Sequence, residues 1–504
     1  MSRSMRGLAA LVVAAGLAAC QRPSQATPVP DTWQVFEDGA MSLELPEWPA
    51  AGEFGEFELT RVAELGRLVT ISRYQGPPRL VGPNVAQALP DNGPFEPVEL
   101  VSQQPETVVI QTTTNSEPFQ RLRMSFYYCA GTTYSVGGAS PVDSWQAFTA
   151  ILDRVEASLT CAEAPVRAER HAKMVGLVVG PAGGDFSYGD YRQAAVQARS
   201  AGLEAAHVYL SWGRVETEPG VFDWTWTDML VDSLWLEGLR LSMVIEFIHT
   251  SVPGEAPSDL EGLAFDDPAY MQRAAAFALA VADRYGDQLD YLAMGNEVNI
   301  YFAEHPQDLD PFLQAFQQIR LAVGGRHPEL PIGTTLAFHE AQNNDRLDLI
   351  EAFKGGDFLA YTYYPHDPLF SYDVPADRFA GALQAMVEVS GETPFFVVEN
   401  GFSSSALLGS SEERQAAYVE QSMQAYLGNE AATGRMIWVG QHDPATSCSP
   451  AAASFFPPDF DPAEIDPDAW QAFQEYLCTL GLRRADGTPK PAWSALLGSL
   501  PSSD

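Results

Sequence analysis

The chain has 504 residues, of which 66 are acidic and only 29 are Lys or Arg, so its formal net charge is -37. A balance this negative argues against nucleic acid and anionic lipid surfaces as partners, because contacts to phosphates require basic residues. Hydrophobic residues make up 46% of the chain and aromatic residues 11%, which excludes a chain that is disordered throughout.

The first 19 residues are predicted to be a signal peptide. Arg3 and Arg6 give a positive start, and the apolar stretch after them is too short to span a bilayer. The end of this stretch, Leu-Ala-Ala followed by Cys20, resembles the cleavage box of bacterial lipoproteins; the alternative is an ordinary secretory signal with a chance cysteine. The resemblance implies a lipid on the Cys20 sulfur and an exported, envelope-anchored protein. The absence of Asp after the cysteine favours the outer membrane if the cell is Gram-negative, and residues 20–31 are predicted to be a flexible tether.

The four remaining cysteines are even in number, which in an exported protein predicts two disulfides. Three pairings are possible. We favour Cys129 with Cys161 and Cys448 with Cys478, because each pair falls within one predicted domain. The sequence has no CxxC or HxxxH spacing, so we expect no metal site.

Residues 32–161 are predicted to form a small α+β domain. β-branched and aromatic residues with turn-formers between them predict strands at 41–45, 57–62, 67–73, 107–113 and 121–129. Apolar residues at three- and four-residue steps then predict one helix over 142–159. The expected fold is an antiparallel sheet backed by a single helix, without a cluster of titratable residues.

A polar linker over 162–172 leads into residues 173–504, where short apolar runs alternate with amphipathic helices. The predicted strands are 174–179, 205–210, 241–247, 291–294, 332–337, 358–363, 395–398 and 436–439. The predicted helices include 191–200, 271–285, 309–323, 379–389 and 412–427. Eight such units predict a (β/α)₈ barrel, an α/β fold. An open doubly wound sheet is less favoured, because no glycine-rich phosphate loop follows the first strand.

Two glutamates come directly after apolar strands of this predicted barrel. Glu297 follows the fourth strand, in Gly-Asn-Glu, and Glu399 ends the seventh, in Val-Val-Glu-Asn. Active sites of such barrels lie where the strands end, so we expect the two carboxyl groups to face each other across the barrel mouth. Paired carboxylates suit glycoside hydrolysis, in which one protonates the leaving oxygen and the other attacks the anomeric carbon or activates water.

These motifs together resemble clan A of the glycoside hydrolases, which are retaining (β/α)₈ enzymes. With Tyr-Tyr-Pro after the sixth strand, the combination looks most like the family 53 endo-β-1,4-galactanases. The resemblance implies that Glu297 is the general acid/base, that Glu399 is the nucleophile and that no cofactor is needed. It also implies that Asn296 binds the sugar 2-hydroxyl and that Tyr364, or less readily Tyr363, supports the nucleophile.

Two further residues are candidates for substrate binding by the same resemblance. His249, after the third strand, resembles a sugar-binding histidine, and Trp438, on the eighth, resembles an aromatic platform. In many clan members an arginine near the end of the second strand supports the nucleophile, but His207 stands near that position here. We therefore assign no arginine to this role.

Each candidate also has a purely structural interpretation. Glu297 alone could cap a helix, Glu399 alone could belong to a buried ion pair, and His249 and Trp438 could belong to the core. A surface lipoprotein that binds carbohydrate without cleaving it is the alternative function, and plain binding does not require two opposed carboxylates. The expected protein is a monomeric, lipid-anchored glycosidase of a β-linked poly- or oligosaccharide.

Overall fold

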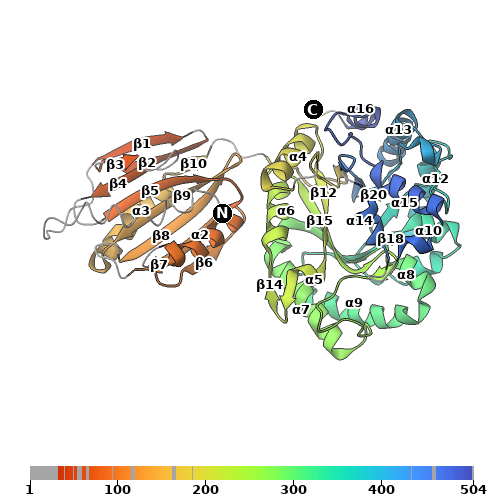
Figure 1. The fold of residues 1–504 in the computed structure, drawn as a ribbon, viewed down its shortest axis with the longest axis horizontal. Helices are drawn as coiled ribbons and strands as arrows, with labels where there is room; N and C mark the ends of the chain where they lie inside the picture. Colours follow the sequence, from red (N-terminus) through yellow and green to blue (C-terminus); the bar gives the residue numbers. More distant parts are fainter. Residues whose placement is uncertain are drawn as a thin grey trace. The chain divides into compact units, whose positions relative to one another are not determined.

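The computed structural model of the chain describes residues 32–38, 40–48, 50–53, 59–63, 67–92, 95–114, 120–161, 166–183, 186–432, 434–445, 447–456 and 461–501. The predicted signal peptide, Cys20 and the tether lie outside these residues. By its contacts the chain divides into two compact units, Met1–Val166 with Asp228–Glu237, and Arg167–Thr227 with Gly238–Asp504 (Figure 1). No helix among the described residues is both long and apolar enough to cross a membrane.

The first unit contains two antiparallel sheets. Strands β1 (Trp33–Asp38), β2 (Met41–Pro46) and β10 (Thr160–Cys161) form the smaller one. The larger has seven strands in the order β3 (Ala50–Glu53), β4 (Leu59–Ala63), β5 (Arg67–Tyr74), β9 (Thr132–Ser140), β8 (Arg121–Cys129), β7 (Thr107–Thr113) and β6 (Glu99–Gln103). The predicted disulfide Cys129–Cys161 is confirmed, and it joins the end of β8 to β10.

Two helices, not the single predicted one, cover the larger sheet. Helix α3 (Trp145–Ala157) packs Phe148 and Leu152 against one face of the sheet. A β-carbon at Gly138 on β9 would collide with both side chains, so this position needs a glycine. Helix α2 (Pro78–Asn92) packs on the opposite face, against Val108 and Phe126. The prediction of one helix was wrong because α2 carries Pro83 and Pro90, which normally argue against a helix interior.

The second unit is a closed barrel of eight parallel strands, which confirms the predicted (β/α)₈ fold. The strands are β11 (Lys173–Leu177), β12 (Ala205–Leu210), β15 (Arg240–His249), β17 (Leu289–Asn296), β18 (Ile332–Ala337), β19 (Leu359–Tyr363), β20 (Phe395–Asn400) and β21 (Gly434–Trp438). β12 pairs with both β11 and β15, so the sheet has no open edge. The strands are almost wholly buried, which explains why each reads as a continuous apolar run.

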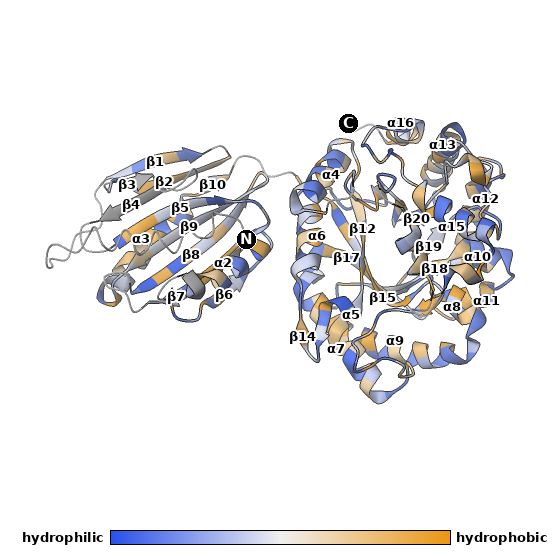
Figure 2. Cartoon of the chain, viewed as in Figure 1, coloured by the Kyte–Doolittle hydropathy of each residue, from blue (hydrophilic) through white to orange (hydrophobic). Residues whose placement is uncertain are grey.

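Helices outside the sheet form an outer layer, and others lie in the loops at the barrel mouth (Figure 1). They are α4 (Tyr188–Ser200), α5 (Trp212–Val215), α6 (Thr225–Trp235), α7 (Pro268–Tyr285), α8 (Val298–Glu304), α9 (Leu309–Gly324), α10 (Phe338–Asn343), α11 (Leu347–Glu351), α12 (Arg378–Ser390), α13 (Glu412–Gly428), α14 (Ser449–Ala453), α15 (Pro467–Cys478) and α16 (Pro491–Ser499). Hydrophobic and hydrophilic residues alternate along the longer ones, such as α7 and α9 (Figure 2), as expected for helices with one face on a sheet. Short strands also lie in the loops, namely β13 (Glu216–Glu218), β14 (Val221–Phe222) and β16 (Val252–Pro253).

A buried ion pair lies inside the barrel. Arg435 on β21 donates from Nη2 to Asp290 Oδ2 on β17 at 2.6 Å, and both side chains are almost wholly inaccessible. Arg240 on β15 donates to the same carboxylate, which therefore joins three strands. Burial alone would raise the pKa of Asp290, but the hydrogen bonds and charges of Arg240, Arg435 and Arg170 hold it below its usual value.

We expect Asp290→Asn to lower the free energy of unfolding by about 3–5 kcal/mol, because the change leaves Arg435 as an uncompensated buried charge. Urea denaturation at neutral pH measures this difference. The matched control is Asp287→Asn, the same change at an exposed position three residues earlier. The control should stay within about 0.5 kcal/mol of the parent protein. An equally small effect of Asp290→Asn would contradict a structural role for the pair.

Candidate active site

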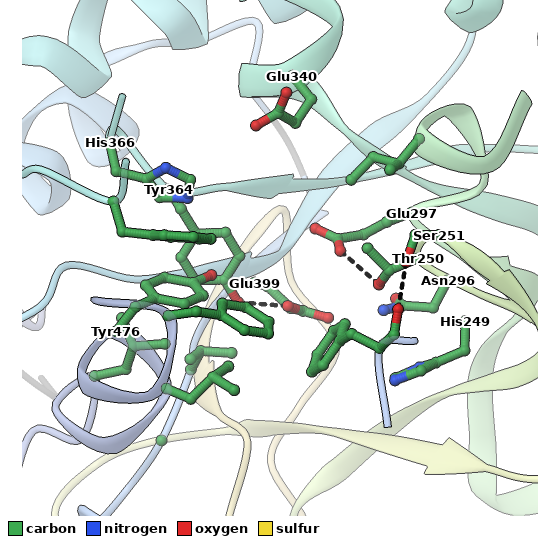
Figure 3. A pocket seen from close by; sticks show the side chains of 18 of the residues that line it. His249, Thr250, Ser251, Asn296, Glu297, Glu340, Tyr364, His366, Glu399 and Tyr476 are labelled. Carbon is green, nitrogen blue, oxygen red and sulfur yellow. Dashed lines mark hydrogen bonds between the residues drawn. The ribbon is translucent and has the colours of Figure 1, made fainter. Parts of the chain in front are cut away.

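Glu297 directly follows β17 and is the N-cap residue of helix α8. Its side chain makes no capping hydrogen bond to that helix, so the capping interpretation does not apply. Instead its carboxylate points into a cavity at the barrel mouth (Figure 3). Oε2 accepts a hydrogen bond from Thr250 Oγ1 at 2.8 Å, and Oε1 accepts one from Thr362 Oγ1 at 2.5 Å. Thr250 lies in the loop after β15 and Thr362 lies on β19. Their hydroxyls fix the orientation of the carboxyl group.

The backbone around Glu297 is strained. Glu297 has φ 50° and Thr250 has φ 55°, in the left-handed region that non-glycine residues rarely adopt. Phe370, with φ 60°, is a third residue of this kind. These three line the same cavity, whereas only two other described non-glycine residues, Ala130 and Asp345, have positive φ. Such strain costs about 1–3 kcal/mol per residue and concentrates at functional sites, which supports this cavity as one.

Glu399, on β20, faces the same cavity. It is 6% exposed, and each carboxylate oxygen accepts one tyrosine hydroxyl: Tyr209 donates to Oε1 at 2.7 Å and Tyr364 to Oε2 at 2.5 Å. Figure 3 shows Glu297 and Glu399 extending from different walls toward the space between them. Both phenols are neutral, so Glu399 has no ion-pair partner among its described hydrogen-bond donors.

Burial raises the pKa of the Glu399 carboxyl, and the negative charge of Glu297 raises it further. The hydroxyls of Tyr364 and Tyr209 act in the opposite direction, because they donate to the ionised form. The net pKa lies above the usual range for a glutamate. The influence of Glu297 on this pKa also shows that the two carboxyl groups are close enough to interact.

Tyr209, Thr250 and Thr362 are the residues that the sequence analysis missed at this site. Tyr209 stands two positions after His207 on β12, and therefore on the same face of that strand. His207 lies deeper in the barrel, where its Nδ1 is 2.9 Å from Ser242 Oγ, and burial lowers its pKa to about 3. No arginine supports Glu399 from β12. Tyr209, one side-chain layer above His207, donates the hydrogen bond instead. Alternation along the strand was the signal that could have found it.

Asn296 and His249 both line the cavity, as expected from the sequence. Asn296 Oδ1 is buried and has no hydrogen-bond partner among the described residues, so it is available to a ligand. The His249 ring lies 4.7 Å from the ring of Phe455, and its Nδ1 lies 3.0 Å from Glu246 Oε1. Burial alone would lower the pKa of His249, but Glu246, together with the charges of Glu297 and Glu399, raises it above the ordinary value.

Tyr363 and Trp438 do not line the cavity, which differs from the expectation. Tyr363 points away from it and packs against Phe379 of α12, because Thr362 and Tyr364 occupy the inward-facing positions on either side. Trp438 is 1% exposed and meets the Tyr418 ring edge-on, so its indole belongs to the packed barrel. Large aromatic residues at strand ends are commonly buried, and strand phase could not be fixed from the sequence.

Residues 447–456 and 461–481, which follow β21, cover part of the cavity, and we call them the cap. Its helices α14 and α15 are joined by the predicted disulfide Cys448–Cys478, which is confirmed. Ser251 Oγ donates to the Phe455 carbonyl at 2.6 Å and ties the cap to the loop after β15. The cap gives the cavity an apolar wall of Phe455, Phe456, Phe473, Tyr476, Leu477 and Leu480. This segment was not assigned to the cavity from the sequence, because it lies outside the eight predicted strand–helix units.

The cavity has a volume of about 560 Å³ and an acidic lining. Glu246, Glu297, Glu340 and Glu399 contribute carboxyl groups, whereas no Lys or Arg is among its described lining residues. Four histidines also reach it, namely His249, His339, His366 and His442. No group of three or more His, Cys, Asp or Glu within the described ranges is arranged to hold a metal ion. The lining can therefore exchange protons and hydrogen-bond hydroxyl groups.

We expect Tyr209→Phe and Tyr364→Phe each to lower kcat/KM by roughly 10- to 100-fold, because each loses a hydrogen bond to a charged group that is worth about 1.5–3 kcal/mol. The lost donor also raises the pKa of Glu399, so the acidic limb of the pH–rate profile should move to higher pH. The control is Tyr361→Phe on the same strand, whose hydroxyl meets Ser390 on the other side. A drop in activity with an unmoved acidic limb would contradict contact with an ionised Glu399.

The similarities between this chain and known proteins are distant. No family model matches the chain. The β-galactosidase BgaA of a Thermus species is 28% identical over 113 residues, which are 19% of this chain and 18% of that protein. The chain thus matches less than a fifth of that relative's length.

Three solved structures of similar fold are glycosidases or named as glycoside hydrolases. An exo-β-1,4-mannosidase from Opitutaceae bacterium strain TAV5 has a TM-score of 0.47 at 18% identity, over 65% of this chain and 58% of that one. A GH5_18 protein from Bifidobacterium longum subsp. infantis has 0.48 at 15% identity, over 66% and 79%. A family 39 glycoside hydrolase from Bacteroides cellulosilyticus WH2 has 0.43 at 16% identity, over 80% and 76%. At these identities the likeness concerns the fold alone.

Proposed function

We propose that the chain is a retaining glycosidase that cleaves β-linked sugars by double displacement. The observation that carries this proposal is the arrangement of Glu297 and Glu399, which face one cavity from the ends of β17 and β20. The negative charge of Glu297 raises the pKa of Glu399. Tyr209 and Tyr364 donate to both oxygens of Glu399 and thereby favour its ionised form, which a nucleophile requires. Glu297 keeps one lone pair free on each oxygen beside its threonine hydroxyls, which suits a group that donates and accepts protons.

The reaction then proceeds in two steps. In the first, Glu399 attacks the anomeric carbon, the bond to the leaving oxygen breaks, and Glu297 gives its proton to that oxygen. In the second, Glu297 takes a proton from water, and the water oxygen displaces Glu399 from the anomeric carbon. Two inversions give net retention. This mechanism uses a separation of about 5–5.5 Å between the two carboxyl groups.

The acidic lining also restricts the substrate. A carboxylate or sulfate on the sugar would meet four carboxyl groups without a Lys or Arg among the described lining residues to offset the repulsion. Neutral hexose or pentose units are therefore the favoured substrates. Galactan, as in family 53, remains one member of this group, and a lipid on Cys20 that anchors the enzyme in the cell envelope is part of the same proposal.

The test is a panel of neutral nitrophenyl β-glycosides, followed by proton NMR of the first sugar released. We expect hydrolysis of at least one glycoside with the β-anomer formed first. Formation of the α-anomer first would contradict the assignment of Glu399 as nucleophile. Tight binding of sugars without release of nitrophenol would instead support a carbohydrate-binding protein.

A further inference from the structure

A second hollow adjoins the catalytic cavity on the side of β12 and β15. It has a volume of about 640 Å³ and shares three lining residues with the cavity, namely Tyr209, Glu246 and His249. The cap also borders both, because Ser454 lines the hollow and the next residue, Phe455, lines the cavity. The two spaces thus adjoin at Tyr209, the partner of the nucleophile, and we call the second one the side groove.

The lining of the side groove includes several groups that bind hydroxyls. Its polar members are Tyr209, Ser211, Arg214, Asp223, Thr227, Glu246, His249, Glu255 and Ser454. Glu255 is held in place by Ser211 Oγ at 3.1 Å and by Arg214 Nε at 3.0 Å. The Arg214 side chain remains 80% exposed, so most of its five donors are open to a ligand. This lining differs from the apolar wall that the cap gives the catalytic cavity.

An exposed tryptophan lies in the same groove. Trp226, in the first turn of α6, is 51% exposed and meets Phe186 and Tyr191 edge-on. These neighbours fix the ring without covering it. Tryptophan is rarely left half exposed, since its large apolar area favours burial. An uncovered aromatic ring surrounded by hydroxyl-binding groups suits a sugar ring, which is apolar on its faces and polar at its edge.

We propose that the side groove binds sugar units of a β-linked oligosaccharide that are remote from the bond being cleaved, with Trp226 as the stacking platform. This inference rests on the proposed glycosidase function and extends it to the substrate's length. One unit occupies the catalytic cavity between Glu297 and Glu399. The oligosaccharide continues past Tyr209 and His249, next to Ser454 and Phe455, into the side groove. Remote binding of this kind raises kcat/KM for long substrates over short ones.

The test compares kcat/KM for β-1,4-linked gluco-, manno- and galacto-oligosaccharides of two to six units, using the parent protein, Trp226→Ala and Val221→Ala. Val221 is the control, because it is exposed, lies five residues earlier in β14 and does not line the groove. We expect kcat/KM to rise with chain length in the parent and in Val221→Ala. In Trp226→Ala the ratio of long to short substrate should fall by about tenfold.

A second measurement separates lost binding from general damage. A pentasaccharide labelled at its reducing end reports which bond is cleaved, and loss of a remote binding site should shift the cleavage position in Trp226→Ala. Equal losses on all lengths with an unchanged cleavage position would overturn the proposal. So would a parent protein that hydrolyses nitrophenyl glycosides but gains nothing from longer chains. Failure on every nitrophenyl glycoside and every oligosaccharide would instead refute the glycosidase function.

Discussion

Replacement of Glu399 by alanine should lower kcat on a nitrophenyl β-glycoside by about 10⁴-fold or more. The reason is that Glu399 supplies the oxygen that bonds to the anomeric carbon, and nothing else described in the cavity occupies its place between Tyr209 and Tyr364. Azide added to Glu399→Ala can enter the space of the missing carboxylate. It should then give a glycosyl azide of inverted configuration, because only one displacement takes place.

The control for this experiment is Glu399→Gln, which keeps the shape of the side chain but cannot attack. It should be as inactive as the alanine variant while its circular dichroism spectrum and melting temperature stay near those of the parent. Activity of either variant at the level of the parent would refute the assignment. A retained glycosyl azide from Glu399→Ala would show that another group is the nucleophile.

Replacement of Glu297 by alanine should produce a different pattern that depends on the leaving group. A phenyl glycoside needs a proton on its leaving oxygen, so its kcat/KM should fall by about 10²- to 10⁴-fold. A dinitrophenyl glycoside leaves without that help, so its first step should be much less affected. Azide should then accelerate the second step and give a glycosyl azide of retained configuration, because it attacks the sugar already joined to Glu399.

The companion variants are Thr250→Val and Thr362→Val, which remove the hydroxyls that orient Glu297. They should reduce activity on phenyl glycosides more than on dinitrophenyl glycosides, in the same direction as Glu297→Ala but less strongly. Equal losses on both substrates in Glu297→Ala, without rescue by azide, would contradict the role of general acid/base.

The barrel and its two glutamates could be predicted because burial leaves a clear mark on the sequence. Strands buried on both faces read as apolar runs, and a charged residue at the end of such a run needs a partner or a function. Those two facts located Glu297 and Glu399 on β17 and β20. The residues that hydrogen-bond to them were harder to find, because these contacts depend on the phase of β12 and β19, for Tyr209 and Thr362, and on the loop after β15, for Thr250.

Other features could not be predicted because they depend on packing rather than on pattern. Helix α2 of the first unit forms despite two prolines, since it buries Val81, Val85 and Leu89 on the sheet. The cap consists of short helices that gain order from a disulfide and from contacts with the barrel. The inward side of β19 was undecided in the sequence, so the roles of Tyr363 and Tyr364 could be separated only by the structure.

The most direct test of the account is to trap the sugar on the protein. A neutral 2-deoxy-2-fluoro β-glycoside with a dinitrophenyl leaving group slows both steps, the second more than the first, so the covalent intermediate accumulates. Digestion and tandem mass spectrometry then identify the residue that carries the fluorosugar. The account predicts one label per chain, on Glu399, and none in Glu399→Gln. A label on any other residue would contradict it, as would rapid turnover of a matched glycoside without any covalent adduct.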